Sequence, residues 1–170
     1  MLGFLFRTLT AEPNRACALF DAITAKAREP HWYVEGKVPD TIDGRFAVLA
    51  TIAAIVLVRL EQYDEEGTSA SIALTERFVE VMESEHRELG LGDPALGRTV
   101  RKLVGSLSRR TDLWRLAAAG QRDWSEATRE SVYKDGASSN ALMHSAAALT
   151  TLWDELQRTD LQALEQGRLQ

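Results

Sequence analysis

The amino-acid sequence predicts an all-α protein, a single-domain helical bundle of about six to seven helices around a central apolar helix at residues 42–61. Between Phe46 and Leu60 every residue except Thr51 and Arg59 is apolar, and a helix that is apolar on all sides must be surrounded by protein or by lipid. The four alanines within this run favour a helix over a buried strand. No stretch of the chain shows the sustained alternation of apolar and polar residues that is typical of strands.

The apolar run is too short to cross a bilayer. At about 1.5 Å per residue it covers roughly 22 Å, whereas the hydrocarbon core of a bilayer is roughly 30 Å thick. A chain of 170 residues with 45% hydrophobic and 26% charged residues is ordinary for one globular domain. We therefore expect a soluble bundle that comprises residues 1–170, with residues 1–10 flexible, rather than a membrane span or a helix docked on lipid.

The first helix is expected to start at Pro13, which suits a first helical turn, and to stop before Pro30. The aromatic-rich connection at residues 31–40 is too interrupted by glycine and proline to form an element of its own. Thr41 is the expected N-cap of the central helix.

A polar turn at residues 63–67 precedes a second long helix, which the spacing of apolar residues predicts from about Thr68 to Leu89. Gly90 is its expected C-terminal cap. The side chains expected on the buried face are Leu74, Phe78, Val81, Met82 and Leu89.

Asp93 and Pro94 predict the start of a third long helix, with Asp93 as the cap, and the helical pattern extends toward Gly120. Its basic side chains are expected to point mostly outward: Arg98, Arg101, Lys102, Arg109 and Arg110.

Three capping signals predict the remaining helices. Residues 123–126 resemble a capping box that opens a short helix, and Ser138 or Ser139 opens a longer one. Residues 159–162 cap a last short helix, which Gly167 closes.

Charge is distributed unevenly along the chain. The net charge of −5 argues against a dedicated nucleic-acid binder, and we expect no DNA partner. Residues 61–88 contain nine acidic and two basic side chains, whereas residues 98–115 contain six basic and one acidic. The basic segment is either a solvated helix face or a contact surface for acidic lipid head groups, an acidic polypeptide or RNA phosphates.

No pattern in the sequence indicates catalysis, so we expect a protein that is not an enzyme and needs no metal or cofactor. Glu83 and His86 have the spacing of a di-iron ligand pair, but no second copy of the motif exists. His144 and Ser145 are neighbours on a helix and therefore face apart. An enzyme acting on a lipophilic molecule inside the bundle would need convergent polar groups around a cavity, which the sequence does not indicate.

Two motifs carry a resemblance to a known family. The first is Val-Pro-Asp-Thr-Ile-Asp-Gly-Arg-Phe at residues 38–46, which leads into the apolar helix. The second begins at residues 82–93 and continues through Gly-Arg-Thr-Val-Arg-Lys at residues 97–102. In this order and spacing, and with looser likeness from about Ala11 to residues 161–169, the chain resembles the ubiquinol–cytochrome c chaperone family over nearly its whole length.

The resemblance implies an α-helical, non-catalytic chaperone that binds newly made cytochrome b and supports assembly of the ubiquinol–cytochrome c reductase (bc1) complex at the inner membrane. In mitochondria, family members also work with a small partner subunit near the ribosomal tunnel exit. Residues 1–7 lack the basic start of a secretory signal and the composition of an import leader, so the chain resembles a bacterial member. We expect a cytoplasmic protein that can also bind peripherally at the cytoplasmic face of the inner membrane.

A client with apolar transmembrane helices and charged loops requires apolar contacts that anchor it and charged contacts that fix its position on the surface. We assign the anchoring to Trp32, Tyr33 and Val38, and to Phe46 if its face is open; the alternative for the first three is a loop that its aromatics pin to the bundle. Contacts with acidic loops or an anionic membrane surface are assigned to Arg45, Arg98, Arg101 and Lys102. A membrane or ribosome adaptor without client-folding activity is the alternative function, and the oligomeric state stays open.

Overall fold

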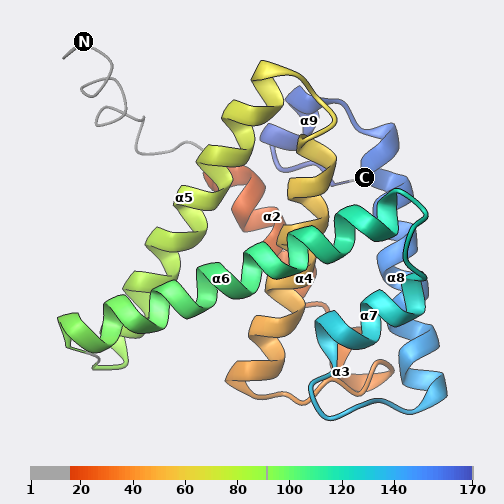
Figure 1. Cartoon of the computed structure of the whole chain (residues 1–170), viewed down its shortest axis with the longest axis horizontal. Coiled ribbons are helices and arrows are strands. Elements are labelled where there is room, and N and C mark those ends of the chain that lie inside the picture. Colours follow the sequence, from red (N-terminus) through yellow and green to blue (C-terminus); the bar gives the residue numbers. More distant parts are fainter. Residues whose placement is uncertain (1–15, 91, 170) are drawn as a thin grey trace.

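The computed structural model describes residues 16–90 and 92–169, and these residues form helices joined by short connections (Figure 1). The prediction of an all-α bundle is confirmed. The expected flexible residues 1–10 and the expected helix start at Pro13 lie outside the described residues. The helices are α2 (Cys17–Ala27), α3 (His31–Val34), α4 (Ile42–Leu60), α5 (Glu65–Glu88), α6 (Asp93–Ala118), α7 (Trp124–Val132), α8 (Ser139–Arg158) and α9 (Leu161–Glu165).

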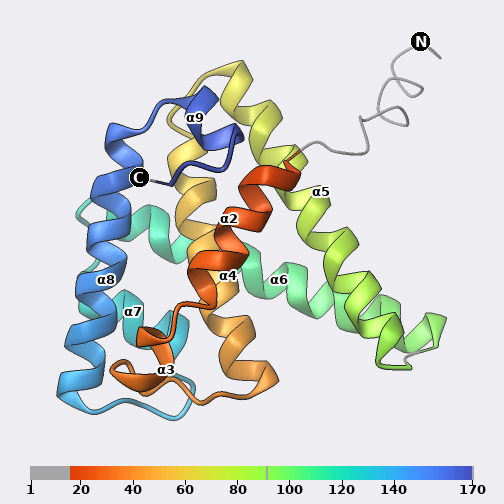
Figure 2. The ribbon, with the colours of Figure 1, turned by 180° about the vertical axis from the view of Figure 1, so that it is seen from behind.

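Helix α4 is the predicted central helix, and it ends at Leu60. It contacts α2, α5, α6, α7 and α8. Helix α6 crosses it on the side seen in Figure 1, and α2 covers the opposite side (Figure 2). Nearly all residues from Ala47 to Leu60 are buried, because a helix that is apolar all round needs neighbours on every side. Thr41 caps it as predicted, since its hydroxyl accepts a hydrogen bond from the Gly44 amide at 3.1 Å.

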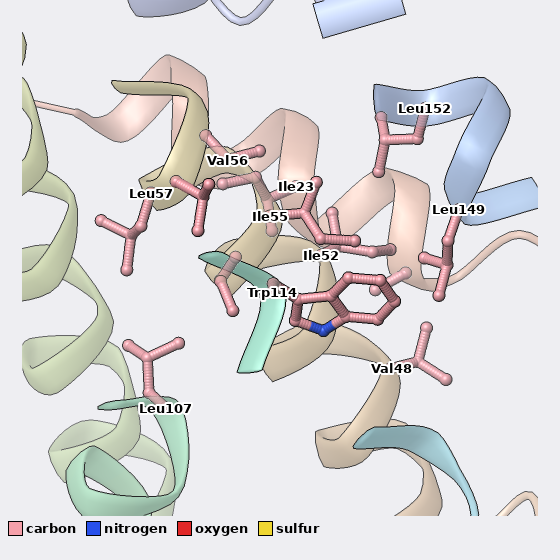
Figure 3. Packing of buried hydrophobic residues seen from close by; sticks show 14 of the residues in the cluster. Ile23, Val48, Ile52, Ile55, Val56, Leu57, Leu107, Trp114, Leu149 and Leu152 are labelled. Carbon is pink, nitrogen blue, oxygen red and sulfur yellow. The ribbon is translucent and has the colours of Figure 1, made fainter. Parts of the chain in front are cut away.

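The core joins the central helix to both flanking layers. Ile52 of α4 lies close to Trp114 of α6 and to Leu149 of α8, and Ile23 of α2 closes the cluster from behind (Figure 3). Full burial of a side chain of this size contributes about 1.5–3 kcal/mol. The Trp114 indole satisfies its polar atom by donating to the Ser131 hydroxyl at 3.1 Å.

The capping signals predict most helix starts correctly. Asp123 accepts a hydrogen bond from the Glu126 amide at 3.0 Å, and Ser138 accepts one from the Ala141 amide at 3.3 Å. The prediction for the last helix is wrong by one residue: Asp160 is the cap of α9 and accepts from the Ala163 amide. The Thr159 hydroxyl instead donates back to the Glu155 carbonyl, so it is not available as a cap.

Three other boundaries differ from the sequence-based expectation. Residues His31–Val34 form the single helical turn α3 where a plain connection was expected. Helix α5 starts at Glu65 rather than near Thr68. Gly92 precedes α6, so Asp93 is the first residue of the helix and not its cap. Acidic residues in a first turn are favoured by the helix dipole, and this accounts for both Glu65 and Asp93 lying inside their helices.

Helices α5 and α6 form a hairpin whose connecting end projects away from the bundle (Figures 1 and 2). The prediction that Leu89 faces the core is wrong, because this side chain lies at the projecting end and is 65% exposed. Leu74 and Phe78, closer to the start of α5, are buried as expected. Within the described residues, no helix combines the length and hydropathy required to span a bilayer.

Candidate partner-binding surface

The connection before α4 is held to the bundle by its aromatic residues. Trp32 is 1% exposed, and its indole N–H donates to the Lys26 carbonyl at 2.8 Å. Val38 is 2% exposed. These two side chains therefore lack the open surface that the predicted anchoring role requires, and they act as the alternative proposed, a loop pinned to the core. The sequence could not distinguish the two, because an aromatic residue serves a core and an interface equally well.

Tyr33 and Arg45 lie together at the start of α4. Tyr33 is half-buried, and its hydroxyl donates to the Ala27 carbonyl at 2.8 Å. Burial raises the pKa of Tyr33 above its ordinary value, against a smaller opposing effect of the nearby Arg45. Arg45 is exposed, with its guanidinium carbon 6.0 Å from the Tyr33 ring centre and its Nε 2.5 Å from Asp40 Oδ1. That hydrogen bond lowers the pKa of Asp40. Arg45 can reach a partner, but it would exchange an existing ion pair to do so.

Phe46 is half-buried between two helices of the hairpin. Its ring centre lies 6.2 Å from that of Phe78 on α5 and 5.9 Å from the guanidinium carbon of Arg110 on α6. Arg110 does not point outward as predicted, because it donates through Nε and Nη2 to the Ser131 carbonyl at 3.1 and 2.8 Å. Burial lowers its pKa. Phe46 thus opens only partly, onto a pocket of about 510 Å³ between α4, α6 and the α7–α8 connection.

Three cations in the first half of α6 have no carboxylate partner among the described residues. Arg98, Arg101 and Lys102 are exposed, as predicted, and in the described part of the chain none of them has an ion-pair partner within 4.0 Å. Arg115, on the same helix, differs: it donates to both carboxylate oxygens of Glu61 at 2.8 Å and to Asp112 at 2.7 Å. We call Arg98, Arg101 and Lys102 the basic stripe. Together with Arg45, it is the exposed part of the predicted surface.

An open groove of about 440 Å³ lies between α4, α5 and α6, and it was not predicted from the sequence. Its apolar lining is Leu57, Ile72, Val104 and Leu107, and its charged lining is Glu61, Glu76, Asp112 and Arg115. Ile72 lines this groove and is 53% exposed. The sequence contains a signal for an exposed apolar residue, because Ile72 lies on the side of α5 away from the buried Ala70, Leu74 and Phe78. It contains no signal for the groove, which depends on how three helices meet.

The chemistry-bearing residues considered for catalysis are not brought together. Ser145 is buried and pairs with the Tyr133 hydroxyl at 2.7 Å, whereas His144 faces the other way, with Nε2 lying 3.0 Å from Nδ1 of His31. Across residues 16–90 and 92–169, no three His, Cys, Asp or Glu side chains are placed to hold a metal ion.

Comparisons with known proteins agree with this architecture. The sequence model of a family described as ubiquinol-cytochrome C chaperone matches residues 34–169, which contain α4 to α9 and the surface described above except Trp32 and Tyr33. The crystal structure of the Cbp3 homolog from Brucella abortus superimposes with a TM-score of 0.77, covering 98% of this chain and 94% of that one at 23% sequence identity, so the two share a fold. A search among curated proteins gives no significant match.

Proposed function

Since the chain belongs to the ubiquinol–cytochrome c chaperone family, we propose that it is a non-catalytic assembly chaperone that binds newly made cytochrome b and supports assembly of the bc1 complex. It acts in the cytoplasm and at the cytoplasmic face of the inner membrane, as a peripheral protein. In that location the protein can bind the first apolar segments of cytochrome b soon after they are synthesised, before these segments have packed against partners in the membrane.

The observation that carries this proposal is that helix α6 borders an open, partly apolar groove and also carries a stripe of cations that have no ion-pair partner among the described residues. Helix α6 contributes Val104 and Leu107 to the groove and the basic stripe to the surface beside it. A newly made membrane protein presents apolar helices joined by charged loops, so its recognition needs both kinds of contact. Apolar burial supplies affinity, and the cations fix the register of the bound segment.

The structure narrows the set of residues proposed to bind the client. The basic stripe stays in the proposal, together with Arg45 and the accessible edges of Tyr33 and Phe46. Trp32 and Val38 are no longer proposed to bind the client, because they are buried. Their role is to hold the connection at the start of α4, and they influence binding only through the position of Arg45 and Phe46.

The test is a pull-down of the tagged full chain from membranes of its own cells, followed by mass spectrometry. We compare the wild type with the stripe reversal, Arg98→Glu, Arg101→Glu and Lys102→Glu together. The matched control reverses three other exposed arginines, Arg28, Arg129 and Arg158, so that the change in net charge is the same. Cytochrome b should be enriched with the wild type and the control and lost with the stripe reversal. Equal enrichment in all three would remove the stripe from the mechanism, and no enrichment with the wild type would reject the chaperone role.

The basic stripe also favours a second candidate function, a membrane or ribosome adaptor without client-folding activity. Anionic lipid head groups and RNA phosphates recognise exposed, unpaired cations in the same way as an acidic loop does. Sedimentation of the protein with anionic liposomes or with ribosomes, combined with absence of cytochrome b from the pull-down, would support the adaptor.

A further inference from the structure

The groove between α4, α5 and α6 has an apolar floor, and several of the hydroxyl groups that line it are already hydrogen-bonded within the protein. The hydroxyls of Ser71, Thr75 and Thr111 line it, and each donates to a carbonyl of its own helix, at 2.9, 2.9 and 3.0 Å. Their hydrogen-bonding capacity is therefore largely used, and they present mainly carbon to an occupant. Leu57 and Leu107 form the floor from two different helices (Figure 3). Such a surface suits a few apolar side chains from successive turns of a helix.

The rim of the groove carries an excess of negative charge. Glu61 and Asp112 share the single guanidinium of Arg115 at one end, which leaves that end with a net negative charge. Glu76, on the α5 wall, is exposed and has no ion-pair partner within 4.0 Å in the described residues. Charges at a partly apolar rim select the sign of the flanking residues of an occupant more than they raise its affinity.

Beyond the groove, toward the projecting end of the hairpin, charges of both signs occur. Helix α5 continues with Glu80 and Glu83, while α6 continues with Arg101, which lies one turn before Val104 on the same side. On α6 the groove lining runs from Val104 to Arg115, about 17 Å or eleven helical residues. The groove itself has three carboxylates, Glu61, Glu76 and Asp112, and one cation, Arg115, so its rim is acidic.

We propose that this groove binds an apolar helical segment of a membrane protein, with the lysine- or arginine-rich flank of that segment lying against the acidic rim formed by Glu61, Glu76 and Asp112. Cytoplasmic ends of membrane-spanning helices carry an excess of Lys and Arg, so they match an apolar groove with an acidic rim. About eleven residues is less than the roughly twenty needed to span a bilayer, so the groove covers the cytoplasmic part of the span and its flank. This inference rests on the proposed chaperone function and adds to it the chemistry of the bound segment.

The test uses the purified full chain and two synthetic helical peptides rich in Leu and Ala, which differ only in carrying Lys–Lys or Glu–Glu at one end. Fluorescence anisotropy should give tighter binding of the Lys peptide. Ile72→Arg places a charge in the groove at an exposed position and should weaken binding about tenfold, the loss expected for a central anchor. Glu76→Lys should remove or invert the preference between the peptides.

Two matched controls keep the outcome specific. Met143→Arg introduces the same charge at an exposed apolar residue of α8, and Asp154→Lys reverses an exposed carboxylate of the same helix; both should bind as the wild type does. Equal affinity of the wild type for the two peptides, binding of neither, or unchanged binding by the Ile72→Arg variant would overturn the inference. The pull-down separates it from the proposed function: if Ile72→Arg still enriches cytochrome b as the wild type does, the groove assignment fails and the chaperone role stands. If the wild type enriches no cytochrome b, the chaperone role fails whatever the peptides do.

Discussion

The carbonyl oxygen of Pro39 lies so close to Gly44 that a β-carbon on Gly44 would be 1.9 Å from it. This contact folds the connecting segment back against the first turn of α4, where Thr41 caps the helix and the Val38 side chain also approaches. The glycine at this place in the 38–46 motif is thus explained by a close approach of backbone to helix. The motif positions α4, and with it Arg45 and Phe46, at the edge of the candidate surface.

Gly44→Ala should destabilise the protein by about 2 kcal/mol, because the obstructing atom is backbone and cannot move aside without disturbing the capped turn. Gly97→Ala is the matched control. Nothing lies within 4 Å of a β-carbon on Gly97, inside α6, so alanine should stabilise the helix there by up to about 1 kcal/mol. Urea denaturation of both variants measures the two free energies of unfolding. Equal effects of the same sign would contradict the account of the motif.

Arg59 joins the end of α4 to the end of α8. It is buried, and it donates to the Leu156 carbonyl at 2.8 Å and to the Thr159 carbonyl at 3.2 Å, where the α8 dipole favours a positive charge. Arg59→Met would remove both of these charge-assisted hydrogen bonds and should lower the free energy of unfolding by about 2 kcal/mol. The loss is limited because the Thr159 amide still donates to the Leu156 carbonyl, and the Tyr63 hydroxyl to the Thr159 carbonyl. Arg158→Met, an exposed change on α8, should cost less than about 0.5 kcal/mol. A loss below that small value for Arg59→Met would show that the link contributes nothing.

Tyr133 predicts a loss of stability at alkaline pH. Its buried hydroxyl donates to the Gly36 carbonyl at 2.6 Å, and burial raises the pKa of Tyr133, with a smaller lowering by the Ser145 hydrogen bond. Tyrosine in the unfolded chain ionises near pH 10. The stabilisation is therefore complete below about pH 10 and is lost as pH rises toward the higher folded-state pKa, because the unfolded chain releases its proton first.

The Tyr133→Phe variant should be less stable at neutral pH by about 1 kcal/mol, through loss of the hydrogen bond. Its stability should then fall less steeply above pH 10 than that of the wild type, because the variant lacks the Tyr133 hydroxyl and its raised pKa. Denaturant midpoints measured at pH 8 and at pH 10.5 give the comparison. Parallel decline of the two proteins would place the alkaline sensitivity elsewhere.

The stripe reversal should separate folding from binding. Arg98, Arg101 and Lys102 are exposed and unpaired within the described residues, so reversing all three should change the free energy of unfolding by less than about 1 kcal/mol. Binding of the wild type to its client should weaken as salt is raised from low to physiological concentration, because exposed charges are screened over about 8–10 Å. Salt-independent binding would indicate that the stripe is only a solvated face.

The periodicity of apolar residues and the capping residues predict the architecture well, because both are local. The run from Phe46 to Leu60 can only be a surrounded helix, and Thr41, Asp123 and Ser138 mark helix starts through contacts with residues three positions ahead. A predicted helix boundary is wrong where two local hydrogen bonds compete for one side chain. At Thr159 the hydroxyl bonds back to α8 and does not cap the next helix.

The binding surface is only partly predictable from the sequence, because exposure is a tertiary property. Charged residues at the projecting end of the hairpin, such as Arg98, are outward in almost any arrangement. The orientation of Trp32 and Arg110 depends on which helix lies opposite, and the structure turns both inward. The groove at Ile72 arises from the angle between α5 and α6, which no local pattern in the sequence specifies.

The most direct test of the chaperone role is a pulse-chase experiment in the cells that make this protein. Proteins are labelled briefly during synthesis, the tagged full chain is purified at successive times, and labelled cytochrome b bound to it is measured. The account predicts that labelled cytochrome b co-purifies immediately after the pulse and declines during the chase as it enters the bc1 complex. Absence of labelled cytochrome b at every time, with normal expression of both proteins, would contradict it.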